Sequence, residues 1–259
     1  MALPFLVPAT IRKHSIDRAP TPGEHFENAP GTWGRCAVCS APRPCQPCKL
    51  VVPETVWGAD PPYARKRVPR TQALYRAGGP FQCLYAVRSG FFKTSAMLAD
   101  GRAQVTGFHM MGEILGMGGI DTGHHASDAI AIEDSEVCVI PSARLEEPVM
   151  HRELYRAMSR ELVRDQGVML LLGTMSSAGR VAVFLLTLSQ RLLARGFSAR
   201  DFHLRMTRQE IGSYLGMSLE TVSRIFSRFD DERLIRVDGK HIRILDIEGL
   251  DAVAGRDAR

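Results

Sequence analysis

Hydrophobic and polar positions alternate along several short runs in the first half of the chain, the pattern of half-buried β-strands. Turn signals separate these runs at Arg88–Gly90, at Ala99–Arg102 and in the glycine-rich stretch 112–125. The runs are FQCLYAV (81–87), FFKTSAML (91–98), AQVTGFHM (103–110) and AIAIEDSEVCVI (129–140). Their even spacing predicts an all-β barrel or roll between about Val51 and Ser142.

A helical pattern follows. Residues from Glu147 to about Met175 contain no proline beyond the first turn, and only Gly167 and Gly173 weaken them, so one long helix is expected. Five positions on it follow the 4-3-4-3 rhythm of a coiled-coil seam. They are Met158, Leu162, Asp165, Met169 and Leu172. Two alternatives stay open: the helix packs on its own domain, or it rotates so that Asp165 points to water.

The stretch TRQEIGSYLGMSLETVSRIFSRF (207–229) predicts two short helices joined by a tight turn. Thr207 and Glu210 have the spacing of a capping box. Gly216 stands where a helix ends with positive φ, and Ser218 caps the next helix. The buried face of the second helix is expected to contain Val222, Ile225 and Phe229. A further helix is predicted at 179–194, with Gly196 as its stop.

This layout is that of a helix-turn-helix, whose second helix presents its first turns to base edges in the major groove. Leu234–Leu245 adds two strand-like runs around Asp238-Gly239, a strong hairpin signal. A hairpin directly after a helix-turn-helix indicates a winged helix. An ordinary helical hairpin with a solvated polar face is the alternative interpretation of the two helices alone.

The polar positions of the second helix are candidates for base contacts. Arg224 can donate two bonds to guanine, Glu220 can accept from cytosine, and Ser223 can contact either base. Four further residues are weaker candidates for phosphate contacts, which position a protein on DNA without specifying a sequence. They are Arg208, Gln209, Ser218 and Arg228.

With ETVSR at its centre, 207–229 resembles the DNA-binding motif of the Crp/Fnr family of bacterial transcription regulators, and YAVRSG, GFHMMGE and GHH extend the resemblance over the strand region. The resemblance implies an α+β chain with an N-terminal β-roll like that of cyclic-nucleotide-binding proteins, a dimerisation helix and a C-terminal winged helix-turn-helix. It also implies a homodimer on double-stranded DNA, at an inverted-repeat operator with TTGAT half-sites. The exposed turn Asp100–Arg102 becomes a weak candidate contact for RNA polymerase.

The expected organisation is an N-terminal extension with a cysteine loop (1–49), a β-roll (50–146), a dimerisation helix (147–176), a winged helix-turn-helix (177–250) and a polar, frayed tail (251–259). If Asp165 lies in the seam, two copies about 5 Å apart repel by roughly 3 kcal/mol at an effective dielectric near 20. The dimer is then marginal and switchable.

At 259 residues, 45% hydrophobic and 24% charged, the composition is ordinary for a globular protein of two domains and a tail. The net charge of +5 permits a polyanionic partner without demanding one. No apolar run approaches the roughly 18 residues of a membrane span. The apolar run at the start of the chain, within MALPFLVPATIRKH, is too short for a secretory signal. A cytoplasmic protein is expected, so the six cysteines favour metal or redox roles over disulfides.

Four cysteines gather in CAVCSAPRPCQPCK, where prolines block helix and sheet: Cys36, Cys39, Cys45 and Cys48. Thiolates select zinc or an iron–sulfur cluster, and the spacing leaves both open. The resemblance narrows to the oxygen-sensing Fnr subgroup, whose C-x2-C-x5-C pattern and distant fourth cysteine match Cys36, Cys39, Cys45 and Cys138. It implies a 4Fe–4S cluster that oxygen converts to a smaller form, loosening the dimer. Cys48 then has no role in the pattern, and two alternatives stay open: it replaces one of the ligands, or it is a spare thiol.

The remaining candidates receive structural interpretations. Cys83 is expected to be a buried core thiol, and His109, His124 and His125 to serve packing or loop roles. No Lys or Arg lies between Arg102 and Arg144, so an anionic phosphate inside the roll lacks a cation; a cyclic nucleotide is therefore not expected as effector.

No nucleophile–base set points to catalysis. Two competing functions are a regulator of the same fold with structural zinc and another signal, and an iron–sulfur electron carrier, which leaves the winged helix without a role.

Overall fold

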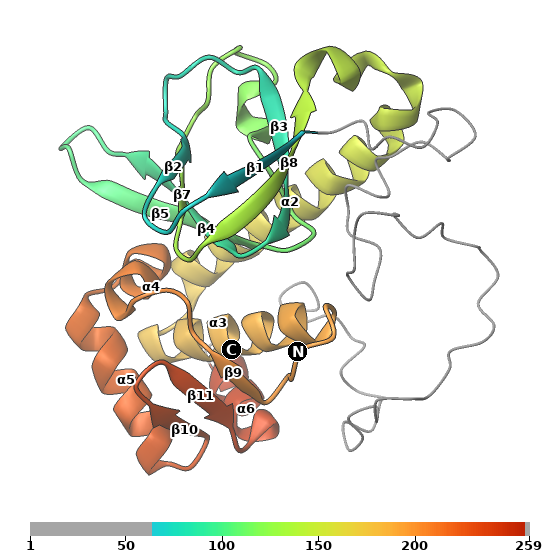
Figure 1. Cartoon of the computed structure of the whole chain (residues 1–259). Helices are drawn as coiled ribbons and strands as arrows, with labels where there is room; N and C mark the ends of the chain where they lie inside the picture. The colour runs from blue at the N-terminus through green and yellow to red at the C-terminus, as the bar shows by residue number, and fades with distance from the viewer. Residues whose placement is uncertain (1–63, 257–259) are drawn as a thin grey trace, which may run out of the picture. The chain divides into compact units, whose positions relative to one another are not determined.

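The computed structural model describes residues 64–256, which form two compact units, residues 64–164 and 165–256 (Figure 1). The long helix α2 (Pro148–Thr174) contributes to both. The predicted N-terminal extension lies outside the described residues, and so do Cys36, Cys39, Cys45 and Cys48. Within residues 64–256, no helix combines the length and apolar character that crossing a membrane requires.

The first unit contains two antiparallel four-stranded sheets, ordered β1-β8-β3-β6 and β2-β7-β4-β5 (Figure 1). The strands are β1 (Arg65–Val68), β2 (Ala73–Tyr75), β3 (Cys83–Ser89), β4 (Phe91–Met97), β5 (Ala103–Met110), β6 (Ile114–Leu115), β7 (Asp128–Ala131) and β8 (Ser135–Pro141). The predicted roll is therefore confirmed. Three strands, β1, β2 and β6, were not predicted, because each is too short to show alternation.

The run 129–140 was predicted as one segment, and this was wrong. The structure divides it into β7 and β8, which belong to different sheets. One distant and one local hydrogen bond stabilise the intervening turn: Asp134 Oδ1 accepts from the backbone N–H of Arg70 over 2.8 Å, and Ser135 Oγ donates to the carbonyl of Glu133 over 2.7 Å. The acidic residues inside the run were the signal for the break.

Strands β3 and β8 bury both of their faces. One apolar cluster lies between the sheets and contains Leu74, Val87, Phe92, Ala129 and Val137 among others. A second covers the opposite face of β3 and β8, where side chains of α2 pack. Its members are Leu84, Ala86, Ile114, Ile140, Met150, Leu154 and Ala157. The first turns of α2 are thus part of the core of the β-roll.

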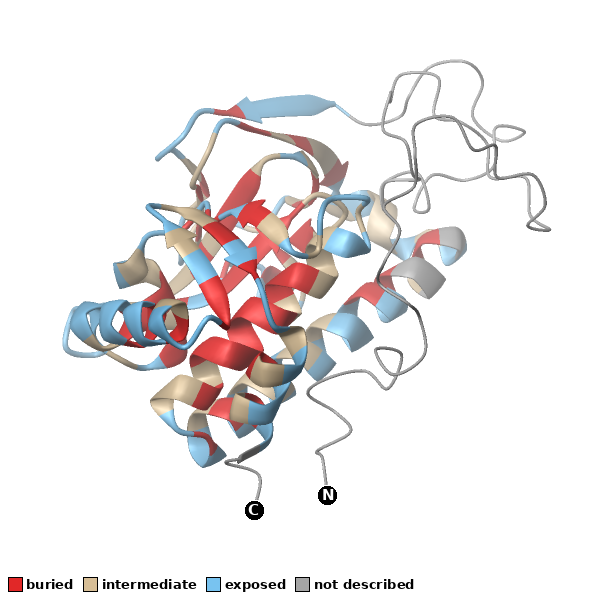
Figure 2. Cartoon of the chain, turned by 90° about the horizontal axis from the view of Figure 1, so that it is seen from below, coloured by how far each residue is buried: buried red, intermediate tan, exposed pale blue. Residues whose placement is uncertain are grey.

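The second unit begins within α2 and continues with α3 (Ser177–Leu193), β9 (Asp201–His203), α4 (Arg208–Leu215), α5 (Leu219–Asp231), β10 (Ile235–Asp238), β11 (His241–Ile244) and α6 (Ile247–Arg256). Helix α3 is largely buried (Figure 2, buried residues in red). The hairpin was predicted around Asp238-Gly239; its turn consists of Gly239 and Lys240, since Asp238 pairs with His241. Strand β9 extends the hairpin to three strands, ordered β10-β11-β9.

The polar tail was predicted to fray after Leu250, and the structure corrects this. Helix α6 continues to Arg256, with Leu250 and Ala254 buried. These two residues lie four positions apart, on one face of the helix, so their burial stabilises the extra turn.

Candidate functional site

Local hydrogen bonds define the predicted α4-turn-α5 motif. Thr207 N donates to Oε2 of Glu210 over 2.7 Å and Glu210 N donates to Oγ1 of Thr207 over 3.1 Å, which completes the capping box. Gly216 ends α4 with φ +64°. At Gly212, a β-carbon would lie 2.6 Å from the carbonyl oxygen of Met217. Glycine at position 212 therefore permits the tight turn.

Helix α5 buries one face and exposes the other. Ser218 Oγ accepts from the backbone N–H of Thr221 over 3.2 Å, as expected of a cap. The predicted buried residues are confirmed, with one addition. They are Val222, Ile225, Phe226 and Phe229. Among the predicted base-contacting residues, Glu220, Ser223 and Arg224 are all exposed near the start of the helix.

The exposed start of α5 carries a negatively charged hydrogen-bond acceptor, Glu220, and a positively charged donor, Arg224. The pKa of Glu220 is lowered by its own backbone N–H, by the hydroxyl of Ser218 and by the charge of Arg224. Arg224 Nη2 lies 3.4 Å from the hydroxyl oxygen of Thr221. An ionised carboxylate and a guanidinium one turn apart can accept from cytosine and donate to guanine.

The predicted phosphate contacts fall into two groups. Gln209, Ser218 and Arg228 are exposed, and Arg228 Nε lies 3.7 Å from Oε1 of Glu232. Arg208 is half-buried, and its guanidinium lies against the ring of Phe226.

One arginine that sequence analysis did not single out joins α4 to the helices before it. Arg180, in the first turn of α3, donates to the carbonyl oxygens of Leu172, Met175 and Leu215 over 2.8, 3.0 and 3.1 Å. These carbonyls belong to the ends of α2 and α4, where a cation is favourable. The spacing of residues gave no signal, because the acceptors meet only in the folded unit.

Cys138 is the one predicted cluster ligand among the described residues. It lies in β8, paired with Arg65 of β1 and Ala86 of β3. Its half-buried side chain packs against the cluster that contains Met150 and Leu154 of α2. The thiol therefore lies on the sheet face that carries the start of α2. In the described part of the chain, no group of three or more His, Cys, Asp or Glu side chains is arranged to hold a metal ion.

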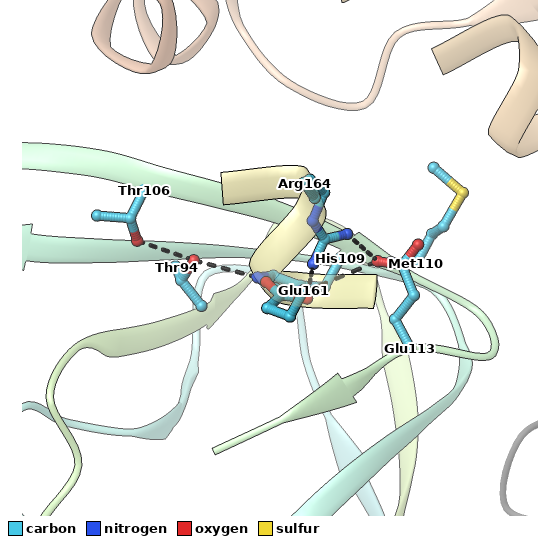
Figure 3. A network of polar contacts seen from close by, with 7 residues as sticks. All are labelled: Thr94, Thr106, His109, Met110, Glu113, Glu161 and Arg164. Carbon is cyan, nitrogen blue, oxygen red and sulfur yellow. Dashed lines mark hydrogen bonds and ion pairs between the residues drawn. The ribbon is translucent and has the colours of Figure 1, made fainter. Parts of the chain in front are cut away.

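A network of polar side chains joins the β-roll to α2 farther along the helix (Figure 3). Glu113 Oε2 accepts from Arg164 Nη1 over 3.1 Å and lies 3.9 Å from Nδ1 of His109, and Arg164 is also paired with Glu161. Nε2 of His109 lies 3.2 Å from Oγ1 of Thr94. His109 was expected to have a packing role, and it is buried; its acidic neighbour Glu113, four positions later, was overlooked.

The other two predicted structural histidines differ from each other. His125 is buried and stacks on Tyr75 with ring centroids 3.8 Å apart, and burial lowers its pKa. His124 is exposed, and its ring contacts the backbone of Thr122. Cys83 was predicted to be a buried core thiol; it is half-buried, because it lies at the end of β3, and burial raises its pKa.

The predicted seam residues of α2 are mostly exposed. Met158, Leu162 and Met169 expose 43%, 59% and 69% of their surface, Asp165 is exposed and Leu172 is half-buried. Further large apolar side chains of α2 that the rhythm did not include are exposed as well: Tyr155, Val163 and Leu170. An apolar surface of this kind on one helix is typical of an interface.

The turn between β4 and β5 is exposed, as predicted. The Asp100 carboxylate accepts hydrogen bonds from the side chain and from the backbone N–H of Arg102, and these bonds lower the pKa of Asp100. Met97 and Leu98 next to it are exposed too.

Known proteins share this arrangement. A Crp-like helix-turn-helix domain matches residues 179–253, and a cyclic nucleotide-binding domain matches residues 65–152. The transcriptional activator protein Anr of Pseudomonas protegens is 44% identical over 226 residues, covering 85% of this chain and 92% of that protein. The fumarate and nitrate reduction regulatory protein of Salmonella typhimurium is 38% identical over 231 residues, covering 86% and 92%.

Among solved structures, FixK2 from Bradyrhizobium japonicum is similar, with a TM-score of 0.67 and 30% identity over 74% of this chain and 96% of that one. The regulator TTHB099 from Thermus thermophilus shares the fold at a TM-score of 0.62 and 22% identity. Proteins of this kind are transcription regulators and not enzymes. The chain is a member of the Crp/Fnr family: a DNA-binding transcription regulator with an N-terminal cyclic-nucleotide-binding-like β-roll and a C-terminal winged helix-turn-helix.

Proposed function

We propose that this protein is an oxygen-responsive regulator of the low-oxygen response, acting in the cytoplasm. Cys36, Cys39, Cys45 and Cys138 would ligate an oxygen-labile 4Fe–4S cluster, and the protein would bind TTGAT-type inverted repeats as a homodimer while the cluster is intact. Relatives named for fumarate and nitrate reduction and as Anr point to anaerobic regulation. The structural observation that carries the proposal is Cys138, half-buried on the sheet face against which α2 packs.

The donor set suits the proposed group, since thiolates are the soft ligands that iron–sulfur clusters use. When bound, the cluster supplies a centre that reacts with oxygen. The chain supplies its position: Ala86 and Arg65 hold the backbone of Cys138 in the sheet, and Met150 and Leu154 of α2 pack beside it. A cluster held by Cys138 would therefore influence how the start of α2 packs on the roll.

The proposed dimer forms along α2, through Met158, Leu162, Asp165, Met169 and Leu172. The ion pair between Glu113 and Arg164 fixes the helix to the roll one residue before Asp165. Two Asp165 side chains about 5 Å apart repel by roughly 3 kcal/mol. Small changes in how the roll holds α2 then tip the balance between monomer and dimer. Changing Asp165 to Ala is expected to give a dimer without the cluster; a monomeric apo-variant in light scattering contradicts the switch.

The proposed effector is not a cyclic nucleotide. No Lys or Arg lies between Arg102 and Arg144 to meet a phosphate. In the same stretch, the buried ring of His125 stacks on Tyr75, and its lowered pKa favours the uncharged form. This stretch therefore offers no cation to a bound phosphate, and an unpaired anion would be costly to bury.

On DNA, Glu220, Ser223 and Arg224 are proposed to read bases, and Gln209, Ser218 and Arg228 to contact phosphates. The exposed turn Asp100–Arg102 is proposed as a contact for RNA polymerase.

Anaerobic purification of the full chain tests the proposal, with Cys138→Ala and Cys83→Ala as a matched pair of half-buried thiols on neighbouring strands. The wild type and Cys83→Ala are expected to be brown, with about four iron atoms per chain, to bleach in air and to bind the inverted repeat. Cys138→Ala is expected to lose cluster, dimer and operator binding together. A colourless, air-stable wild type that contains zinc contradicts the oxygen sensor and supports a zinc-containing regulator of the same fold.

A further inference from the structure

Arg208 belongs to α4 and contacts two other elements of the winged helix, α5 and the hairpin turn. It is the first residue of α4, and its guanidinium carbon lies 3.5 Å from the centroid of the Phe226 ring on α5. Its Nη2 donates to the carbonyl oxygen of Gly239 in the hairpin turn over 3.3 Å. Its Nη1 is buried and meets no acceptor among residues 64–256. The guanidinium thus makes one hydrogen bond and one ring contact within the domain.

Partial burial of this guanidinium changes its chemistry. Burial lowers the pKa of Arg208 to about 10, so the group stays charged at neutral pH while it loses part of its hydration. A desolvated cation over an aromatic face is held more strongly than an exposed one. A planar guanidinium can stack on the ring and donate in its own plane to the carbonyl, whereas a lysine ammonium cannot do both.

The hairpin turn is held from a second direction. Lys240 Nζ donates to the carbonyl of Arg205 over 3.1 Å, and the backbone N–H of Leu204 donates to the carbonyl of Lys240 over 2.8 Å. These bonds attach the turn to the segment before α4, but neither reaches α5. At the base of the hairpin, Arg236 Nε of β10 lies 3.3 Å from Asp230 Oδ1 of α5. At its tip, Arg208 links the turn to the ring of Phe226 on α5.

We propose that Arg208 is a positioning residue, which fixes the wing (β10, β11 and their turn) against α5 so that both meet DNA in one orientation. Its role is then not a phosphate contact, as its sequence position suggested. The inference rests on DNA binding by the winged helix and is independent of oxygen sensing. Preorganisation of this kind strengthens binding because less freedom is lost on association.

Salt dependence of operator binding by the anaerobic full-length protein separates the two roles. Arg208→Met and Arg208→Lys are both expected to weaken binding about tenfold, with an unchanged slope of log Kd against log salt. Arg228→Met is the matched control: an exposed arginine whose loss is expected to lower the slope by about one unit per phosphate contact. Wild-type affinity in Arg208→Lys, or a reduced slope in Arg208→Met, overturns the proposal.

Two further measurements do not depend on that comparison. Phe226→Leu keeps an apolar side chain and removes the ring, so it is expected to reproduce the effect of Arg208→Met, and the double variant to be no weaker than either. Additive losses contradict coupling through the ring. In the free protein, amide hydrogens of residues 235–244 are expected to exchange about tenfold faster in Arg208→Met. Unchanged exchange rules out the positioning role, even if the wild type fails to bind the proposed operator.

Discussion

The contacts that shape the helix-turn-helix join residues close together in sequence, whereas those that place Cys138 join distant strands. Thr207 meets Glu210 one turn later, and Gly212 meets Met217 across the following turn. Cys138 is positioned by Arg65 and Ala86, which lie on two other strands of the sheet. The DNA-reading part can therefore be recognised from a short stretch, while the sensory part depends on the whole roll.

The largest expected effect comes from disturbing the local contacts of the helix-turn-helix. Gly212→Ala is expected to destabilise the winged helix by about 2–3 kcal/mol, because its β-carbon would clash with the carbonyl of Met217. Thermal unfolding and operator binding measure the loss. Gly255→Ala in α6 is the control, since its β-carbon meets no atom within 4 Å. Equal stability of the two variants would show that the tight turn does not require glycine.

Arg224→Ala tests base recognition separately from the stability of the same motif. The side chain is exposed, so the free energy of unfolding is expected to stay within about 0.5 kcal/mol of the wild type. Binding to the inverted repeat is expected to weaken by about 1–3 kcal/mol, through the lost guanine contact. Titration against the repeat and a scrambled duplex measures the specific part. Ser227→Ala, exposed on the same helix, serves as control; a wild-type affinity for Arg224→Ala refutes the assignment.

Arg164→Met tests a contact between residues distant in sequence, because it removes the ion pair between α2 and Glu113. Both side chains are largely shielded from solvent, so the roll is expected to lose about 1–2 kcal/mol of unfolding free energy. Arg102→Met provides contrast: its pair with Asp100 is exposed, so the unfolding free energy is expected to stay close to that of the wild type. Denaturant unfolding of both variants gives the comparison. Similar losses in the two would mean that the network in Figure 3 adds nothing beyond a surface pair.

The smallest expected effect concerns pH. The pKa of Asp201 is lowered by hydrogen bonds from His241 and Arg243 of β11. A carboxylate with a depressed folded pKa contributes stability above its ordinary pKa of about 4, and that contribution is lost as the pH falls through the folded value. Asp201→Asn is expected to flatten the fall in melting temperature between about pH 5 and pH 3. An identical pH profile excludes the contribution.

Features set by residues close together in sequence were predicted correctly. The capping box at Thr207, the stop at Gly216 and the buried face of α5 were predicted and are confirmed. Each depends on spacing within one or two helical turns. The long helix α2 was predicted almost to the residue, because its pattern is sustained. The roles of Cys138 and of the α2 seam stay predictions.

Other features were missed or wrong for a physical reason that they share. The run 129–140 was taken as one segment, although β7 and β8 pair in different sheets. The tail was expected to fray, although Leu250 and Ala254 are buried and extend α6. Strand pairing and the docking of a short helix both depend on partners far along the chain, and no local pattern reports them.

The sequence by itself determined the identity of the DNA-binding motif, since caps, glycines and helical periodicity act between near neighbours. The tertiary structure alone decided that Cys138 faces the start of α2, that Arg164 meets Glu113 and that Arg208 lies over Phe226. These contacts arise when distant segments bury apolar surface together. The energy that selects them belongs to the assembled core and not to any one stretch of residues.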